Sequence, residues 1–246
     1  MSVGNNQLEA RNAKRSIKRQ PRALRVEAIE DAARVVFCRR GYAAASIAEI
    51  AAEAGLSEGS IYKFFESKRH LVLRVIEGWY ESMIREFEVG LAGISGTSNK
   101  MRFIIWRHLH SLKRDPELAR LCVNEVRNGG DYYQSDLLAL NRRYTRIFID
   151  VCKEGVAKGE LRSDIPVTLM RDLVFGCIDH HISGMLYGRD DIDVDASTEK
   201  IMRTVFVGIQ GKSTRPSSHD QSVDDKLDQI TQRLDEVVGL LGRSQV

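Results

Sequence analysis

The chain has 246 residues, of which 43% are hydrophobic and 29% charged, with a formal net charge of +3. This composition indicates a soluble globular protein with a real core and excludes a disordered chain. No run of about 18 apolar residues occurs, and no apolar stretch follows the basic N-terminus, so we expect neither a membrane-spanning helix nor a signal peptide. The cysteines are scattered without a CxxC pair, at Cys38, Cys122, Cys152 and Cys177. We therefore expect no disulfide framework or zinc finger, and a cytoplasmic protein without a cofactor.

Apolar residues recur at i, i+3, i+4 and i+7 over long segments, proline is rare, and alternating strand patterns are hard to find. This pattern predicts an all-α fold of about nine helices. Residues 1–24 come first and form a basic arm that we expect to be disordered alone. The first 25 residues carry one acid, Glu9, against Arg11, Lys14, Arg15, Lys18, Arg19, Arg22 and Arg25. Contact with DNA, in which Arg22 and Arg25 take part, and a solvated tail both remain open interpretations.

A three-helix unit follows at 25–70. The first helix is expected over 25–40, with Gly41 ending it. Ser46 and Glu49 have the spacing of a capping box at the start of the second helix, and Gly55 suits the φ > 0 turn that ends it. The expected core of the unit comprises Ile29, Ala33, Phe37, Ile47, Ile50, Ala51, Leu56, Ile61 and Phe65.

The third helix of this unit is short, and Ser57 is expected to N-cap it with its hydroxyl. It extends to Phe65. Two short helices around a tight turn have the arrangement of a helix-turn-helix, whose second helix enters the major groove of DNA. This stretch is the strongest functional signal in the chain.

A long helix begins after Ser67 and runs to about Leu91, with apolar residues at helical spacing. Further helices are expected over 100–114, 116–127, 136–158, 166–187 and 197–209. Residues 211–222 are expected to be a linker. The last segment, 223–242, has an amphipathic, heptad-like pattern that is too short to establish a coiled coil, so self-association and folding back onto the body both remain open.

The motifs SIAEIA at 46–51, AGLS at 54–57, GSIYKFF at 59–65 and SK at 67–68 follow one another after Phe37 and Gly41-Tyr42. In order and spacing they resemble the DNA-binding domain of the TetR family of bacterial transcription regulators. The resemblance implies a homodimer, with an effector-binding and dimerisation domain over 71–210. Segments at 124–127, 154–161 and 174–179 are similar to the fatty-acyl-CoA-responsive branch of the family. His70, and a tail beyond Gly211, depart from the family pattern.

The expected DNA contacts lie around the recognition helix. Small residues there permit close approach to the groove, Ser60 and Lys63 can reach base edges or phosphates, and helix starts bind anions. The resemblance implies that the Tyr62 hydroxyl contacts phosphate; the alternatives are a core aromatic for Tyr62 and a solvated charge for Lys63. The full set is Ser46, Ser57, Gly59, Ser60, Tyr62, Lys63, Lys68, Arg22 and Arg25.

The body mixes apolar groups with isolated polar ones, as ligand pockets do. The candidate effector-binding residues are Trp106, His110, Glu125, Phe148, Phe175 and Asp179; the alternative is that most of them are core. Arg127 or Arg171 is expected to pair with the carboxylates. The spacings of His108 with His110, and of His180 with His181, do not suit chelation, so no metal is expected.

Together these features predict a DNA-binding regulator that represses from a palindromic operator and is released by a small-molecule effector, for example an acyl-CoA. Dimer contacts are expected from Leu169, Leu173, Ile178, Ile182, Met202, Val205 and Phe206. No Gly-rich phosphate loop, nucleophile elbow or zinc signature occurs, which argues against an enzyme. The alternative function is a ligand-independent, nucleoid-type DNA binder.

Overall fold

The structure is a computed structural model that describes residues 21–211. Within this range it is built of helices, which confirms the all-α prediction. The predicted arm up to residue 20, most of the linker and the 223–242 helix lie outside the described residues. The α-helices in chain order are α2 (Arg22–Ala44), α3 (Ile47–Glu53), α4 (Glu58–Ile61), α5 (Lys68–Leu91), α6 (Thr97–Arg114), α7 (Pro116–Leu121), α8 (Asp136–Ala157), α9 (Val167–His181), α10 (Ser183–Leu186), α11 (Val194–Ile201) and α12 (Val207–Ile209). Shorter turns are η1 (Cys122–Arg127) and η3 (Met202–Phe206), both π-helical, and η2 (Tyr132–Gln134), which is 3-10.

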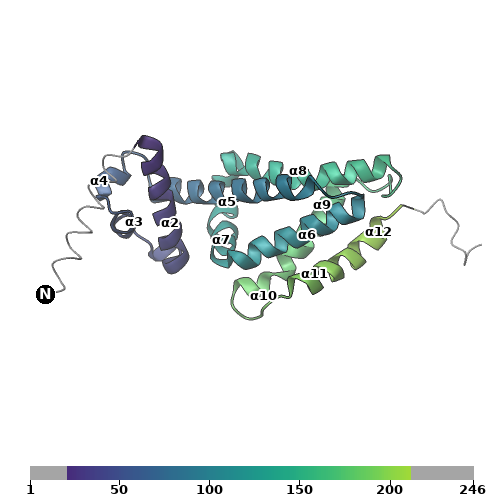
Figure 1. The fold of residues 1–246 in the computed structure, drawn as a ribbon. Helices are drawn as coiled ribbons and strands as arrows, with labels where there is room; N and C mark the ends of the chain where they lie inside the picture. The colour runs from purple at the N-terminus through teal and green to yellow at the C-terminus, as the bar shows by residue number, and fades with distance from the viewer. Residues whose placement is uncertain (1–20, 212–246) are drawn as a thin grey trace, which may run out of the picture.

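The helices form two lobes (Figure 1). We call the small lobe of α2, α3 and α4 the head, and the bundle of α6 to α12 the body. Helix α5 emerges from the head and runs along the body, where it packs against α8. One helix therefore belongs to both lobes.

The head has the core that the spacing predicts. All the expected core residues are buried except Leu56, which packs against the others while partly exposed. Gly41 and Gly55 have φ of 75° and 66°, so each ends a helical segment as expected. Helix α2 begins at Arg22 rather than Arg25, because Pro21 in its extended conformation occupies the N-cap position, so the predicted disordered arm is wrong for residues 22–24.

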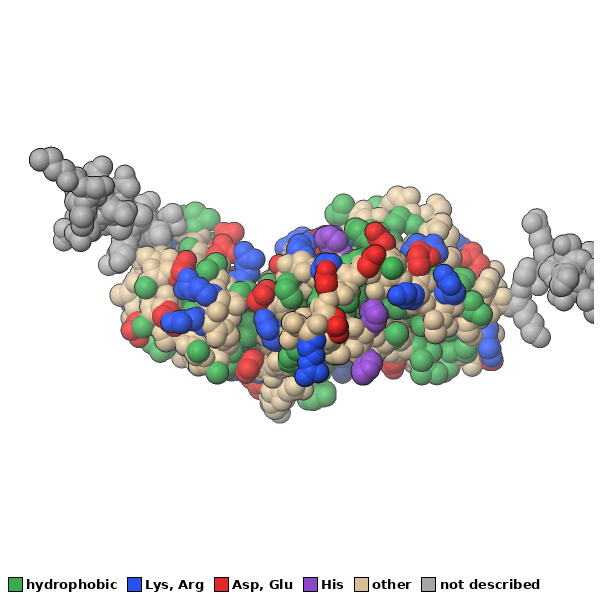
Figure 2. Space-filling view, turned by 90° about the horizontal axis from the view of Figure 1, so that it is seen from below, with side chains coloured by type: hydrophobic (Ala, Val, Ile, Leu, Met, Phe, Trp, Pro, Cys, Tyr) green, Lys and Arg blue, Asp and Glu red, His purple; other side chains and the backbone are tan. Residues whose placement is uncertain are grey.

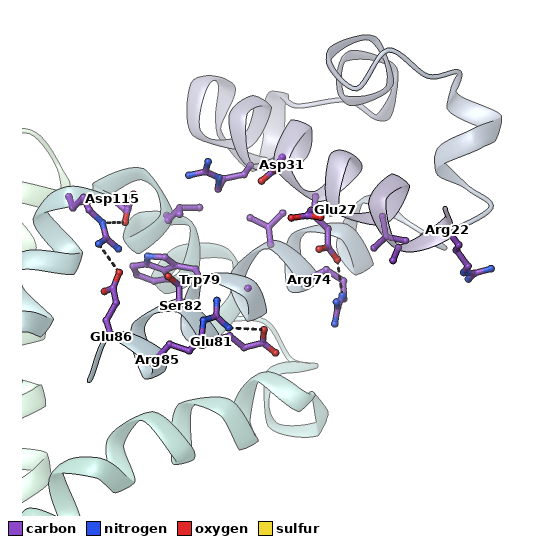
Figure 3. A pocket seen from close by; sticks show the side chains of 18 residues that line it. Arg22, Glu27, Asp31, Arg74, Trp79, Glu81, Ser82, Arg85, Glu86 and Asp115 are labelled. Atoms are coloured by element: carbon purple, nitrogen blue, oxygen red, sulfur yellow. Dashed lines mark hydrogen bonds and ion pairs between the residues drawn. The ribbon is translucent and has the colours of Figure 1, made fainter. Parts of the chain in front are cut away.

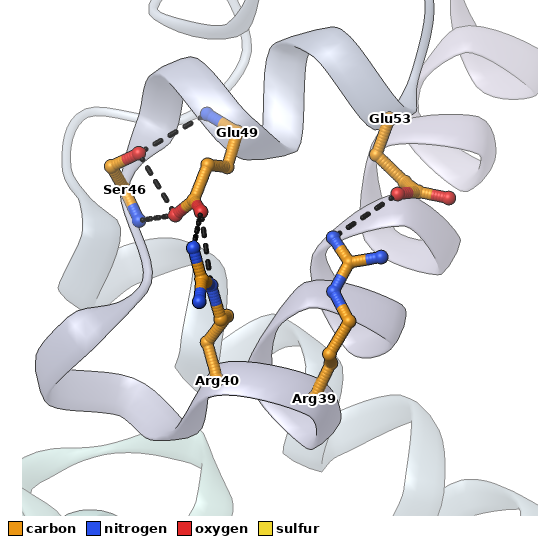
Figure 4. Close-up of polar contacts among 5 residues, drawn as sticks. All are labelled: Arg39, Arg40, Ser46, Glu49 and Glu53. Carbon is orange, nitrogen blue, oxygen red and sulfur yellow. Dashed lines mark hydrogen bonds and ion pairs between the residues drawn. The ribbon is translucent and has the colours of Figure 1, made fainter.

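The start of α3 is held by side chains from two helices (Figure 4). Ser46 and Glu49 form the predicted capping box, in which each side chain bonds the other residue's backbone N–H at 3.1 Å. Arg40 donates to the Glu49 carboxylate at 3.0 Å, and Arg39 pairs with Glu53 at 3.4 Å. The Arg40 and Ser46 hydrogen bonds lower the pKa of Glu49. Arg39 and Arg40, near the C-terminal end of α2, thus bond this helix to α3.

Helix α5 is anchored at its first residue. Ser67 caps it, as predicted, by accepting from the His70 N–H at 3.0 Å. The Lys68 ammonium donates to the carbonyl oxygens of Tyr42, Ala43 and Ala45 at 2.9, 3.3 and 2.9 Å. It also lies 4.6 Å from the centre of the Tyr42 ring. Lys68 therefore ties α5 to the end of α2 and to Ala45, which follows it.

In the body, three predicted helices are interrupted. The 116–127 segment is α7 followed by the wide turn η1, and the 166–187 segment breaks at Ile182 between α9 and α10. The last helical segment begins at Val194 instead of residue 197, because the Asp193 side chain caps it by accepting from the Ala196 N–H at 3.0 Å. It then widens into η3.

Some of the residues expected at the dimer interface are exposed, and others are buried in the core. Leu169 and Leu173 are 48% and 46% exposed on α9. In contrast, Ile178, Ile182 and Met202 are buried in the chain's own core, so their prediction as contacts with a partner is wrong. Helical spacing shows that a face is apolar but does not show which neighbour covers it.

The end of α12 is bonded to the turn that follows α8. The Arg162 N–H donates to the Ile209 carbonyl at 2.8 Å, and the Gly211 N–H donates to the Glu160 carbonyl at 2.9 Å. A Cβ on Gly211 would lie 2.4 Å from the Gly159 carbonyl oxygen, so this closure requires glycine. None of the helices from 21 to 211 is both long and apolar enough to cross a bilayer.

We predict that Lys68→Met lowers the free energy of unfolding by about 2 kcal/mol, because it removes the charged donor that three carbonyls share. Lys63→Met is the matched control, since Lys63 is exposed on the same lobe. Urea denaturation followed by circular dichroism measures both. Equal stability of the two variants would contradict the anchoring role of Lys68.

Candidate nucleic-acid interface and internal cavity

The predicted recognition helix is shorter than expected, because α4 ends at Ile61 and the chain continues as a turn to Phe65. Ile61 and Phe65 are buried in the head. Tyr62 is 54% exposed, so the alternative of a core aromatic is wrong. Lys63 is exposed beside it, and Gly59 is exposed with no atom within 4 Å of where a Cβ would be. This surface offers a phenol, an ammonium and bare backbone.

Ser57 lies at the N-cap of α4, but its hydroxyl makes no capping bond. The hydroxyl is instead 2.9 Å from that of Ser60, one turn later. The predicted side-chain cap is therefore wrong, because the two hydroxyls pair with each other. This pair retains free lone pairs and a proton for a phosphate or a base edge.

The start of α2 adjoins the recognition segment. The guanidinium carbons of Arg22 and Arg25 each lie 5.3 Å from the centre of the Phe64 ring. Phe64 thus holds both arginines against the recognition segment by cation–π attraction. Arg22 is exposed and Arg25 half-buried. These two predicted contacts belong to the same end of the head as the recognition segment.

Lys68 has a different environment. Its ammonium has three N–H donors, and three backbone carbonyls accept them. The structure therefore assigns the side chain to the protein's own backbone instead of the predicted phosphate contact. Ser46 also serves the protein, through its capping box, although it remains exposed.

Basic and acidic side chains are interspersed over both lobes on the face that Figure 2 shows. Arg39 and Arg40 in the head pair with Glu53 and Glu49. The face shown in Figure 2 has no broad basic patch, because its basic side chains alternate with acidic ones.

A cleft of about 1040 Å³ separates the two lobes between α2, α5 and α7 (Figure 3). Its walls carry ion pairs, with Arg74 3.1 Å from Glu30 and Arg114 2.9 Å from Glu86. Trp79 of α5 lies at its inner end. A cleft lined by paired charges resembles a joint between lobes more than an apolar ligand site.

A second cavity of about 470 Å³, which we call the internal cavity, lies within the body between α5, α6, η1, α8 and α9 and opens to the surface beside the exposed Asp172, Gly176 and Asp179. This volume falls in the range of small-molecule sites. A neighbouring cavity of about 550 Å³ shares Arg127, Asn141 and Asp179 with it. The residues that line the first cavity include Trp79, Tyr80, Met83, His108, Cys122, Arg127, Asn141, Arg142, Tyr144, Arg171, Phe175 and Asp179.

Only part of the predicted effector site meets at this cavity. Phe175 and Asp179 line it, and the buried ring of Phe148 lies behind Phe175 with centroids 5.8 Å apart. Trp106 and His110 stack on each other away from the cavity, where the Trp106 indole donates to Asp195 at 2.8 Å. These residues line up on α6 by spacing, yet that face meets α11 rather than the cavity.

Glu125, the sixth predicted effector residue, is also absent from the cavity lining. It borders a surface pocket of about 340 Å³ between the head and η1, together with Gly41 and Tyr42. Its backbone carbonyl accepts a hydrogen bond from Arg69 at 2.6 Å. Glu125 therefore belongs to the contact between the lobes.

The polar groups of the cavity include an ion pair and a thiol. Asp179 pairs with Arg127 at 3.2 Å, as one of the two expected pairings proposes, whereas Arg171 pairs with Asp172. Burial raises the pKa of the Cys122 thiol to about 11, so it stays protonated.

His108 is one of the polar lining residues that the sequence prediction missed as an effector-binding residue. Its Nδ1 lies 2.5 Å from the Tyr144 hydroxyl, and desolvation lowers its pKa to about 3, so the imidazole is neutral at pH 7. The signal was present in the sequence, because His108 continues the buried stripe of α6 formed by Met101, Ile104, Ile105, Leu109 and Leu112. A histidine within such a stripe has to face a core or a cavity.

His181 bonds the Ser197 hydroxyl at 2.9 Å. From residue 21 to 211, the side chains of His, Cys, Asp and Glu form no cluster of three that suits a metal ion. The four cysteines are free thiols.

Comparison with known proteins matches both lobes to families. Residues 29–75 match the model described as bacterial regulatory proteins, tetR family, and residues 79–208 match that of the YsiA-like protein C-terminal region. The fatty acid metabolism regulator protein of Bacillus subtilis (strain 168) is 24% identical over 184 residues, covering 75% of this chain and 95% of the relative. The repressor KstR2 of Mycolicibacterium smegmatis is 26% identical over 152 residues, covering 61% and 74%.

Among solved structures, FadR from Bacillus subtilis in complex with stearoyl-CoA has the same fold, with a TM-score of 0.68 and 24% identity over 74% of this chain and 98% of that one. Two consecutive family matches therefore agree with the helix-turn-helix head and the helical body described above. The chain belongs to the TetR family and is a DNA-binding transcriptional regulator.

Proposed function

We propose that this regulator is a homodimeric repressor that binds a palindromic operator through its two heads and is released when an apolar ligand of the acyl-CoA class fills the internal cavity of the body. The observation that carries the proposal is the joint presence of an exposed reading surface at Gly59, Tyr62 and Lys63 and a ligand-sized cavity in the same chain. A repressor that responds to a ligand needs both.

The acyl-CoA class is supported by chemistry as well as by likeness. Apolar groups of the cavity, such as Met83 and Phe175, suit an acyl chain. The guanidinium groups of Arg127, Arg142 and Arg171 also line it and suit phosphate oxygens. The similar Bacillus subtilis structure contains stearoyl-CoA.

A continuous set of contacts joins the cavity to the head. Arg127, which lines the cavity, lies in η1, and the Glu125 carbonyl of the same turn accepts from Arg69 of α5. Arg69 also holds Asp131, just after η1, with two hydrogen bonds. Its neighbour Lys68 bonds the end of α2. We infer that a ligand which displaces η1 acts on the head through these adjacent residues.

Dimerisation is proposed through the outer face of α9 and the end of the chain's helical part. Leu169, Leu173 and Val207 are exposed there, and large apolar side chains in water favour an interface. Two heads on a two-fold axis read a palindrome and double the contacts of one short recognition segment.

The reading function is tested by selecting DNA duplexes from a random library with the purified protein, followed by footprinting. We expect one palindromic site to be protected. Lys63→Met is expected to weaken binding to that site about tenfold and to change the preferred sequence. Tyr62→Phe is expected to weaken all duplexes alike, because a phosphate contact carries no sequence information. Uniform protection of unrelated DNA would instead support the nucleoid-type alternative.

Dimerisation is tested by placing charges on α9. The double change Leu169→Glu and Leu173→Glu is expected to give monomers at micromolar concentration in sedimentation velocity, since it buries carboxylates in the interface. Val89→Glu is the control, because Val89 is an apolar residue of α5 that is 79% exposed. A wild-type protein that is monomeric with and without DNA would refute the dimer.

A further inference from the structure

Unpartnered polar atoms gather at the internal cavity. In residues 21–211, six buried side-chain nitrogen or oxygen atoms lack a hydrogen-bond partner. Two of them belong to residues that line the cavity, Trp79 Nε1 and His108 Nε2, and Trp79 also lines the cleft between the lobes; a third, Tyr132 Oη, belongs to a residue of the neighbouring cavity. Buried polar groups are normally paired, so such a concentration at one site requires an explanation.

His108 is the central member of this group. One of its two ring nitrogens already has a hydrogen-bond partner, because Nδ1 is 2.5 Å from the Tyr144 hydroxyl. The ring packs edge-on against Phe175, with centroids 5.1 Å apart, so an apolar wall surrounds it. Nε2 remains without a partner in a residue that is 7% exposed. The Nε2 atom of the neutral imidazole can form a hydrogen bond with an uncharged ligand group, and no protein carboxylate is bonded to it.

Trp79 Nε1 and Tyr132 Oη limit which ligand groups could form hydrogen bonds with these unpartnered atoms. An indole N–H is a donor only, so Trp79 requires an acceptor oxygen. A phenol such as Tyr132 can donate to the same kind of oxygen. If Tyr144 donates its proton to Nδ1, then His108 presents an Nε2–H donor; in the other tautomer Nε2 accepts from a hydroxyl. A keto or hydroxyl oxygen is therefore the group that these atoms have in common.

An unsubstituted alkyl chain has no such oxygen. It would fill the apolar part of the cavity but would cover His108 Nε2 and Trp79 Nε1 without bonding them, and unpaired buried groups oppose binding. A ligand with an internal oxygen gains those bonds.

We propose that the preferred ligand is an acyl-CoA whose apolar part carries an internal keto or hydroxyl oxygen, held by His108 Nε2 with Trp79 Nε1 as a second donor at the same cavity. This inference rests on the proposed function, because it specifies the ligand of the same cavity. It makes His108 the specificity-determining residue.

The test compares stearoyl-CoA with a positional series of hydroxystearoyl- and oxostearoyl-CoAs on the full-length protein. Each is titrated against the protein bound to its selected operator, and release is followed by fluorescence anisotropy. We expect at least one oxygenated member to release the operator at a concentration about tenfold lower than stearoyl-CoA does. In His108→Phe this preference is expected to shrink to within about twofold.

Two further variants separate specificity from folding. His110→Phe is the matched control, since it is the same substitution on α6 at a residue that does not line the cavity; it is expected to keep the preference. His108→Gln retains a donor and an acceptor and is expected to preserve part of it. Melting temperatures of the unliganded variants show whether each is folded.

The outcomes distinguish this inference from the proposed function. Equal release by stearoyl-CoA and every oxygenated member overturns the inference and leaves the proposed function standing. A preference that survives unchanged in folded His108→Phe also overturns it. Failure of all these acyl-CoAs to bind or to release the operator overturns the inference and the proposed ligand class together.

Discussion

The bond between the Lys68 ammonium and the carbonyls of Tyr42, Ala43 and Ala45 is the interaction on which the arrangement of the two lobes depends. It joins the first residue of α5 to the end of α2 and to Ala45, which follows it. Since α5 also packs along α8 in the body, the helix has one end in each lobe. A rigid helix fixed at both ends converts a small shift in the body into a movement of the head.

The next residue extends this junction to the cavity. Arg69 bonds Asp131 and the Glu125 carbonyl; Glu125 lies within the turn that contributes Cys122 and Arg127 to the cavity wall, and Asp131 follows that turn. The wide π-helical turn η1 is a natural place for adjustment, because such turns are less regular than an α-helix and recur at functional sites. Lys68 faces the head and Arg69 faces the body, so two adjacent residues couple the lobes.

The head was predictable from the sequence because its signals are local. The capping box of Ser46 and Glu49, the helix ends at Gly41 and Gly55, and the apolar stripes each depend on residues a few positions apart. The same is true of the exposed reading surface, once Ile61 and Phe65 are assigned to the core.

The cavity was only partly predictable, because its lining depends on how distant helices meet. Spacing placed Trp106 and His110 on one side of α6, but it did not reveal that this side faces α11 while His108 faces the cavity. Glu125 was predicted as an effector-binding residue because of its carboxylate. In the structure its backbone carbonyl makes the defining contact, a hydrogen bond from Arg69. The breaks at Ile182 and η1 likewise arise from packing between helices, which the pattern of a single segment does not contain.

Coupling of the cavity to the head is tested most directly by amide hydrogen exchange with and without the acyl-CoA that releases the operator. In the wild-type protein we predict altered exchange both at residues 122–131 and at residues 41–46. In Arg69→Gln we predict that the change at 122–131 persists while the change at 41–46 is lost. A change at 41–46 that is absent from the wild type, or that survives in Arg69→Gln, would contradict transmission through this junction.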